Sequence, residues 1–223
     1  MRVEWFGQSA FCLRGAEGSV FIDPFDDISG LASRGIRFEY PAIDAGEVDL
    51  VLITHEHRDH NGVEAIAGEP AVLRSRAGKH DSPIGAVLGI ASEHDDAAGT
   101  ERGDNTIFAF ELEGMRVVHF GDFGQSQLRP EQAAAIGAPD LLLLPIGGGP
   151  TIGAAAAAEV VAALRPRWVV PMHFRTPRVS DFVEPADEFL ALMERVERLE
   201  SPSLETDTLP VADGPVAVVP ASP

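Results

Sequence analysis

A run of nine residues, Thr-His-Glu-His-Arg-Asp-His-Asn-Gly at positions 54–62, constrains this chain more than any other feature. It places three histidines and one aspartate within six residues, directly after the apolar run 49–53, which is typical of a buried strand. Imidazole nitrogens and carboxylate oxygens are ligands that suit zinc, iron and manganese. The run therefore predicts a metal site at a strand end, and the alternative of a solvated polar loop is disfavoured by the clustering of the ligands.

The spacing of these ligands predicts how they divide between metals. Alternate residues of an extended segment point in the same direction. His55 and His57 are therefore expected to share one metal, while Asp59 and His60, where the chain turns, face a neighbouring one.

Three more candidate ligands each follow an expected strand. His94 lies in Ser-Glu-His-Asp-Asp, Asp122 in His-Phe-Gly-Asp-Phe-Gly, and His173 in Val-Val-Pro-Met-His-Phe. Any one of them alone would more often be structural than a ligand. Together with the motif at 54–62 they complete the shells of two metals.

Length and charge exclude several classes of protein. A chain of 223 residues fits one domain, 1–223, with a sizeable core. Its 35 acidic and 17 basic residues give a net charge of −18, which argues against nucleic acid and anionic membranes as partners. The sequence shows no signal peptide and no apolar run long enough to span a membrane, so we expect a cytoplasmic protein. The single cysteine, Cys12, excludes an intrachain disulfide and is expected in the core.

Hydrophobic periodicity divides the chain into short elements. Strands are expected at 2–6, 10–14, 19–23, 49–54, 86–93, 106–113, 115–120, 140–145 and 168–172, with weaker strand character at 209–220. Helices are expected at 62–67, 130–136, 153–164 and 185–199, the last one charged and amphipathic. The segment 24–47 has no clear periodicity and predicts a long loop that flanks the site.

Over nearly its whole length the chain resembles the metallo-β-lactamase superfamily of metal-dependent hydrolases. The resemblance rests on residues in family order: Trp5-Phe-Gly-Gln-Ser-Ala-Phe, Phe21-Ile-Asp-Pro, the His-rich motif, His94, Gly121-Asp122 and Pro171-Met-His173. The chain looks most like the compact branch that includes ascorbate-phosphate lactonase. Many members of that branch have histidine where this chain has Gln8, so a role of that histidine is either lost or taken over by the Gln8 amide.

The resemblance implies the fold and the ligand set. The fold would be α/β, a single-domain, four-layer αββα sandwich with the metals at one edge between the sheets. The cofactors would be two divalent ions, Zn²⁺ with Mn²⁺ or Fe as alternatives. The first ion would be held by His55, His57 and His94, the second by Asp59, His60 and His173, and Asp122 would bridge them.

Such a site predicts hydrolysis. A water that bridges two divalent ions has its pKa lowered from 15.7 to about 7, and the resulting hydroxide attacks a carbonyl or phosphoryl centre. The expected substrate is a small ester, lactone or phosphodiester, and Asp59 and Asp122 are the candidate catalytic residues. An iron-dependent oxidoreductase is the alternative, because the same ligands hold iron. A non-catalytic metal-binding module is disfavoured because all seven ligands are present.

Other residues are expected to support the site. Asp23, at a strand end, and His119 are predicted to lie behind the ligands and orient them. Gly148 and Thr151, in a Gly-rich loop before a helix, predict an anion site, although turn geometry and helix capping explain them equally well. Arg175 is a candidate anion clamp. The partner is expected to be a small-molecule substrate, and assembly into a homo-oligomer stays open.

Overall fold

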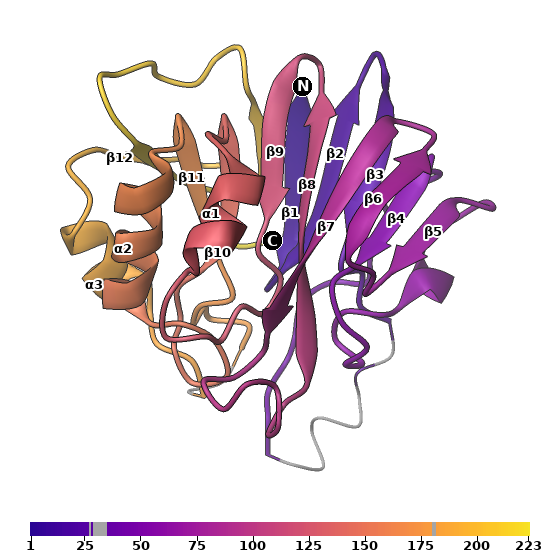
Figure 1. Cartoon of the computed structure of the whole chain (residues 1–223). Helices are drawn as coiled ribbons and strands as arrows, with labels where there is room; N and C mark the ends of the chain where they lie inside the picture. Colours follow the sequence, from indigo (N-terminus) through magenta and orange to yellow (C-terminus); the bar gives the residue numbers. More distant parts are fainter. Residues whose placement is uncertain (27, 29–34, 180–181) are drawn as a thin grey trace.

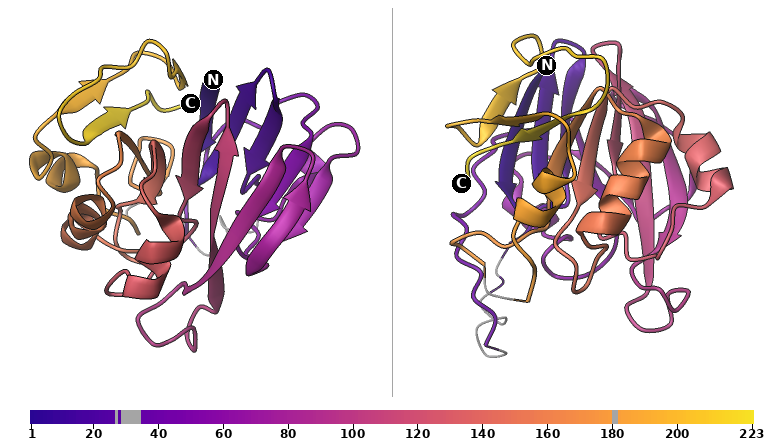
Figure 2. Two further views of the ribbon diagram at one scale, coloured as in Figure 1. Left: turned by 45° about the horizontal axis from the view of Figure 1, so that its top comes forward. Right: turned by 90° about the vertical axis from the view of Figure 1, so that its left-hand side faces the viewer.

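Two β-sheets face each other and form most of the structure, a computed structural model that describes residues 1–26, 28, 35–179 and 182–223. Figure 1 shows the sheets side by side, with the α-helices on the outer side of one of them. The turned views in Figure 2 show the same order of layers. The expected α/β sandwich is therefore confirmed.

The first sheet has six strands in the order β13-β1-β2-β3-β4-β5. Their bounds are Arg2–Gly7 (β1), Ala10–Gly15 (β2), Gly18–Ile22 (β3), Leu50–Ile53 (β4), Ala71–Arg74 (β5) and Ser203–Glu205 (β13). Strands β1 to β3 form the expected antiparallel meander, whereas β4 pairs parallel to β3. Parallel pairing brings the carboxyl ends of β3 and β4 to the same edge of the sheet.

The second sheet has eight strands in the order β12-β14-β11-β10-β9-β8-β7-β6. Their bounds are Gly78–Ser82 (β6), Gly85–Glu93 (β7), Asp104–Leu112 (β8), Met115–His119 (β9), Leu141–Pro145 (β10), Trp168–Met172 (β11), Val196–Arg198 (β12) and Val216–Val219 (β14). Strands β9, β10 and β11 are parallel, and β7 runs the same way as β9 because β8 lies antiparallel between them. The carboxyl ends of these four strands therefore meet at one edge.

The helical layer covers only one side of the sandwich among the described residues. The α-helices Pro130–Ile136 (α1), Ala154–Leu164 (α2) and Asp187–Ala191 (α3) lie beside the eight-stranded sheet in Figure 1. Beyond the six-stranded sheet, the fourth layer expected from the resemblance is made by the 3-10 helix Val63–Ala65 and by irregular chain that packs Phe25, Tyr40 and Val48 against it. No described helix combines the length and the apolar character that a membrane crossing needs.

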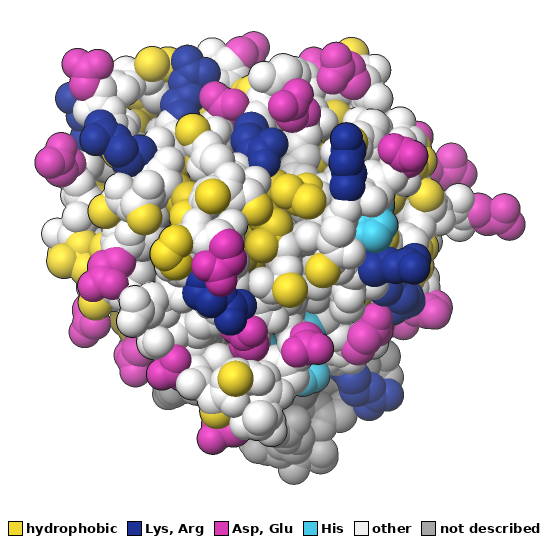
Figure 3. Space-filling view, viewed as in Figure 1, with side chains coloured by type: hydrophobic (Ala, Val, Ile, Leu, Met, Phe, Trp, Pro, Cys, Tyr) yellow, Lys and Arg dark blue, Asp and Glu magenta, His cyan; other side chains and the backbone are white. Residues whose placement is uncertain are grey.

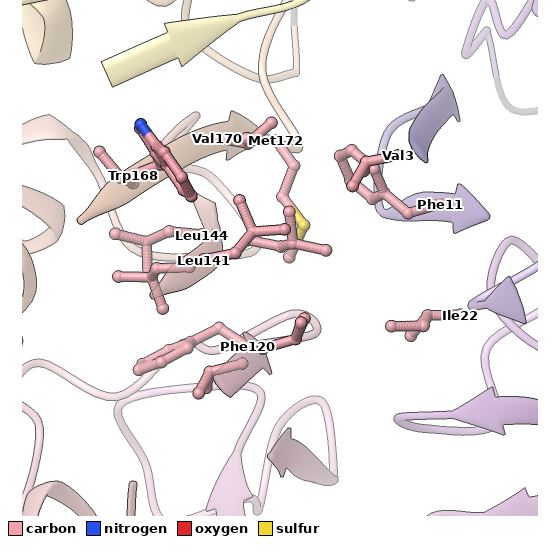
Figure 4. Close-up of a cluster of buried hydrophobic side chains, with 14 of the residues drawn as sticks. Val3, Phe11, Ile22, Phe120, Leu141, Leu144, Trp168, Val170 and Met172 are labelled. Atoms are coloured by element: carbon pink, nitrogen blue, oxygen red, sulfur yellow. The ribbon is translucent and has the colours of Figure 1, made fainter. Parts of the chain in front are cut away.

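The main core lies between the sheets. Figure 4 shows part of it, with Val3, Phe11 and Ile22 from the six-stranded sheet facing apolar side chains from the eight-stranded sheet. Both faces of β4 are buried: Leu50 and Leu52 join the inter-sheet core, while Val51 and Ile53 join the outer cluster. Alternate side chains of a strand point to opposite faces, which explains why β4 is apolar throughout.

The expected helix at 185–199 is confirmed only at residues 187–191 and is wrong beyond them. Helix α3 is one short segment, and the chain then forms the edge strand β12, which pairs with β14. Beyond α3, Leu192 and Val196 are exposed, whereas Met193 and Leu199 pack against the core from non-helical chain. Strands β5, β6 and β13 were not expected either, because they are too short or too polar for hydrophobic periodicity to indicate them. The expected loop at 24–47 holds where it is described, and its residues 27 and 29–34 lie outside the described part.

Candidate metal centre

Seven side chains from both sheets converge at the edge where the strand ends meet. The chain leaves β4 directly into the motif at 54–62, which turns at His57–His60 through a hydrogen bond from His60 N to His57 O. From the other sheet, His94 follows β7, Asp122 follows β9, and His173 follows β11. The parallel strand arrangement is what brings together residues so distant in the sequence.

One group of possible ligands consists of His55, His57 and His94. One nitrogen from each imidazole lies within 4.8 Å of the others. His55 Nε2 and His57 Nδ1 are 3.1 Å apart. His55 and His94 are buried, while His57 is exposed and opens the group to solvent. The spacing of the motif predicted the pairing of His55 with His57, and the family resemblance implied the addition of His94.

A second group consists of His60, Asp122 and His173, all buried, with ligand atoms again within 4.8 Å. Asp122 Oδ2 lies 3.3 Å from Nε2 of each of His60, His94 and His173, and 4.0 Å from Nε2 of His55. One carboxylate oxygen is therefore adjacent to imidazole nitrogens of both groups, which is the position that a bridging ligand requires.

Asp59 lies at the rim of the site. Its Oδ2 is 3.7 Å from His60 Nε2, and its side chain is 28% exposed. It does not belong to either compact group. Its carboxylate is therefore placed to meet a substrate from solvent as well as to approach the second group.

Asp23 holds the motif from behind. At the end of β3, with a side chain that is fully buried, it accepts hydrogen bonds from Thr54 N at 2.7 Å and Thr54 Oγ1 at 2.6 Å. Its Oδ2 also lies 3.0 Å from His60 Nδ1. Because Thr54 Oγ1 donates to Asp23, it is free to accept from His55 Nδ1 at 3.1 Å. Asp23 therefore orients two imidazoles, as the sequence predicts.

His119 is not one of the converging ligands. Its Nδ1 accepts from Gly121 N at 3.0 Å, so its Nε2 donates to Ser9 O at 2.9 Å. Ser9 Oγ in turn donates to Asp122 Oδ1 at 3.2 Å. Both ring nitrogens are occupied, and His119 supports the turn whose serine steadies Asp122.

Burial sets the protonation of most of these imidazoles. Removal from water is the main reason why the pKa of His55 is held well below its usual value. Burial also lowers the pKa of His57 and of His173. These rings are neutral at physiological pH and keep a lone pair for a metal.

His60 and Asp122 behave differently. Burial alone would lower the pKa of His60, but the carboxylates of Asp122, Asp59 and Asp23 outweigh it and raise that pKa well above its usual value. Burial alone would raise the pKa of Asp122, but the imidazoles of His173 and His60 hold it well below its usual value. In the absence of a metal, these neighbours therefore favour the imidazolium form of His60 and the carboxylate form of Asp122.

The predicted anion site in the Gly-rich loop does not agree with the hydrogen bonds there. Gly148 N donates to Ile152 O at 3.0 Å, and Thr151 Oγ1 donates to Gly148 O at 3.4 Å, so both groups are used within the loop. Helix α2 has Gly153 as its N-cap, so Thr151 does not cap it either. Arg175 is half-buried two residues beyond His173, and its backbone N donates to Glu184 O.

The same loop orients a ligand of the centre, which was not predicted from the sequence. Pro150 O lies 3.0 Å from His94 Nδ1 and accepts a hydrogen bond from it, which leaves Nε2 for the metal. Asn105 was also missed: its Oδ1 accepts from Asp122 N at 3.1 Å. No local pattern marks a backbone carbonyl, or an asparagine near the start of a strand, as a partner of the site.

The donor set fits metal ions. It combines imidazole nitrogens with a carboxylate, the ligands preferred by zinc and by non-haem iron or manganese. His60 Nε2 is buried without a hydrogen-bond partner among the described residues, which suits a nitrogen that a metal would engage. Cys12 takes no part: it is buried in the outer cluster, and burial raises the pKa of its thiol to about 11.

Comparisons with known proteins point to one family. A family model described as a β-lactamase superfamily domain matches residues 2–173. A metal-dependent hydrolase of Thermococcus kodakarensis is 31% identical over 202 residues, which cover 79% of this chain and 85% of that protein. A crystal structure from Thermotoga maritima, named as a Zn-dependent hydrolase of the metallo-β-lactamase superfamily, is 30% identical with a TM-score of 0.77 and covers 98% of this chain and 97% of the other.

A more distant likeness extends to another enzyme class. A diiron β-hydroxylase from Streptomyces venezuelae is 16% identical with a TM-score of 0.53, over 77% of this chain and 44% of that chain. A likeness at this level of identity shows the fold alone.

Proposed function

Because the chain belongs to the metallo-β-lactamase superfamily and is a metal-dependent hydrolase, we propose that it acts through a pair of divalent ions, Zn²⁺ in the native enzyme. His55, His57 and His94 would hold the first ion, and His60 and His173 the second, with Asp59 completing that shell. The observation that carries the proposal is the position of Asp122 Oδ2, 3.3 Å from imidazole nitrogens of both groups.

The chemistry follows from these ligands and their surroundings. Two ions bound here would lower the pKa of a water molecule and polarise a substrate oxygen. Asp122 and Asp59 are the carboxylates at the reacting centre, and only Asp59 reaches solvent. We assign to Asp59 the delivery of a proton to the leaving group, because a partly exposed carboxylate can exchange protons with water between turnovers.

The substrate class is a small ester, lactone or phosphodiester. Phe182 is 37% exposed, and its ring centroid lies 6.4 Å from that of His173. It therefore offers an apolar wall beside the second group of ligands, suited to a substituent next to the scissile bond. On the face shown in Figure 3, basic side chains stand among acidic ones, in keeping with a small molecule rather than nucleic acid as the partner.

Metal content is the first test. Protein purified without a chelator or a histidine tag should contain about two zinc or manganese ions per chain, measured by inductively coupled plasma mass spectrometry. Hydrolysis of aryl esters, lactones and bis-aryl phosphodiesters should then disappear on chelation and return with the metal. Mainly iron together with oxygen consumption would instead favour oxidoreductase chemistry, which the fold also carries in the distant diiron hydroxylase.

Substitution of the shared carboxylate tests the two-ion arrangement. Asp122→Ala removes the oxygen that lies between both groups, so hydrolysis should fall by about 10²-fold or more, the scale at which a single electrostatic group contributes to catalysis. His57→Ala removes a ligand of the first group only and should also inactivate. If either variant folds and keeps full activity, the two-ion proposal is wrong.

A further inference from the structure

Besides His60 Nε2, which points into the centre, two buried polar atoms beside it lack a hydrogen-bond partner among the described residues: Gln8 Oε1 and His173 Nδ1. Gln8 is 1% exposed and His173 is 2% exposed, so bulk solvent does not reach either of them. The amide oxygen is an acceptor, and the imidazole nitrogen is a donor when it carries the ring proton. Unpaired buried groups of this kind are rare in folded proteins and call for an explanation.

The two residues are neighbours in space although 165 positions separate them in the chain. His173 N donates to Gln8 O at 3.4 Å. Both backbones adopt positive φ angles, 45° at Gln8 and 51° at His173, which non-glycine residues seldom adopt. Two strained turns are thus joined by a hydrogen bond, an arrangement that is typical of functional positions.

The orientation of the Gln8 amide is determined by its surroundings. Gln8 Nε2 donates to Tyr40 Oη at 3.1 Å and to Phe174 O at 3.4 Å, and a carbonyl such as Phe174 O can only accept. Tyr40 Oη is 2.8 Å from Thr176 Oγ1, so the phenol can donate its own hydrogen bond to that hydroxyl and accept the one from Gln8. These partners identify Nε2 as the donating end of the amide, and Oε1 is the end left to accept.

Three other buried imidazoles show what is expected of His173. His55 Nδ1 faces Thr54 Oγ1 at 3.1 Å, His60 Nδ1 faces Asp23 Oδ2 at 3.0 Å, and His94 Nδ1 faces Pro150 O at 3.0 Å. In each of them an acceptor on Nδ1 leaves Nε2 for the centre. His173 Nε2 likewise lies 3.3 Å from Asp122 Oδ2, yet its Nδ1 has no such acceptor.

We propose that Gln8 is a positioning residue: its Oε1 accepts the Nδ1–H of His173, directly after a small side-chain rotation or through one water molecule. The bond fixes the tautomer of His173 and aims its Nε2 at the centre, as Thr54, Asp23 and Pro150 do for the other three rings. This inference rests on the proposed function in taking His173 as a metal ligand. Many members of the branch have a histidine at this position, and its role was expected to be either lost or taken over by the Gln8 amide. The proposed hydrogen bond favours the second of these two expectations.

The tautomer of His173 is the first readout, and it needs no metal. In ¹⁵N–¹H NMR spectra of the metal-free wild-type protein, His173 should carry its proton on Nδ1, with slow exchange. In Gln8→Met, which keeps the length of the side chain but removes the acceptor oxygen, the ring should show a mixture of tautomers. Gln8→Glu retains an acceptor and should restore the Nδ1–H form.

Metal affinity is the second readout. In competition with a chelator, Gln8→Met should bind its weaker metal about 10–100-fold less tightly, whereas Tyr40→Phe should stay within about threefold of wild type. Tyr40→Phe is the matched control because it loosens the same amide through its Nε2 partner but leaves Oε1 in place.

The outcomes separate this inference from the proposed function. A wild-type His173 that carries its proton on Nε2 overturns the role of Gln8, even if Gln8→Met fails to fold. Two metals bound equally well by wild type and Gln8→Met also overturn it but leave the two-ion hydrolase standing. A wild-type protein with the Nδ1–H tautomer that binds no second metal supports the hydrogen bond and refutes the two-ion proposal.

Discussion

Asp23→Asn is the sharpest test of how the site is built, because this one carboxylate joins the carboxyl ends of β3 and β4 to the ligands. Asp23 is fully buried and receives hydrogen bonds from Thr54 N, Thr54 Oγ1 and His60 Nδ1 at 2.6–3.0 Å. Asparagine has nearly the same size and keeps one oxygen for Thr54 N. Its amide nitrogen replaces Oδ2 and cannot accept a proton from His60, so the imidazole loses the partner that holds its Nε2 toward the centre.

Two magnitudes follow from these contacts. A hydrogen bond to a charged group contributes about 1.5–3 kcal/mol, so the loss of one or two such bonds should lower the free energy of unfolding by roughly 2–5 kcal/mol. In a domain of this size each kcal/mol shifts Tm by about 2–4 °C. Loss of a hydrogen bond that orients a ligand should also weaken metal binding about 10–100-fold.

The control lies at the opposite end of the same strand pair. Asp49 Oδ2 accepts from Ser19 N at 2.8 Å and from Ser19 Oγ at 2.7 Å, which repeats the contacts of Asp23 with Thr54 but involves no imidazole. Asp49→Asn should therefore reduce stability without changing metal affinity. The assays are urea denaturation of the metal-free proteins and chelator competition for zinc.

An Asp23→Asn protein that is destabilised yet binds zinc as tightly as wild type would refute the role of Asp23 in orienting His60. Asp23 would then hold β3 to β4 only, and the orientation of His60 would have another cause. An equal loss of metal affinity in Asp49→Asn would also refute it, because the effect would then come from general loosening of the strands.

Three further predictions address protonation, reactivity and backbone geometry. Carboxylates, Asp122 foremost, raise the pKa of His60 well above its usual value, so a metal must displace a proton there. The affinity for zinc, measured by chelator competition, should therefore fall about tenfold for each pH unit of acidification. An affinity that stays constant from pH 8 to 6 would contradict this. Cys12 is buried with a pKa of about 11, so Ellman's reagent should label it only after unfolding, and rapid labelling of native protein would show that the thiol is accessible. Gly7 has φ +115°, and an added Cβ would clash with the Tyr40 ring, so Gly7→Ala should lower Tm markedly in calorimetry. An unchanged Tm would mean that the turn relaxes at no cost.

Local pattern was enough to predict most of the elements. The meander β1 to β3, the buried strands β4, β10 and β11, and helices α1 and α2 all follow from alternating or continuous apolar residues bounded by glycine and proline. The helix prediction for 185–199 failed beyond α3. The charged and apolar residues of this segment match a helical period, but residues 196–198 pair with β14 as an edge strand. Tertiary pairing of this kind leaves no local trace.

The ligands themselves were predictable as a set because metal chemistry restricts them to a few residue types at strand ends. What holds those ligands was much less predictable. Asp23 was anticipated from its place at a strand end, but Pro150 acts through a backbone carbonyl, which every residue possesses. The Gly-rich loop was expected to bind an anion, and the structure shows its Gly148 amide used within the loop.

The sequence by itself therefore determined the chemistry of the centre: which donors exist, that they lie where strands end, and that no thiol takes part. The tertiary structure alone decided how the donors are shared and oriented. Asp122 lies between the two groups because β9 and β4 end at the same edge of two facing sheets, and Gln8 lies beside His173 because β1 and β11 end there too. Distances of about 3 Å between residues far apart in the chain depend on strand order and direction, which no local pattern of residues encodes.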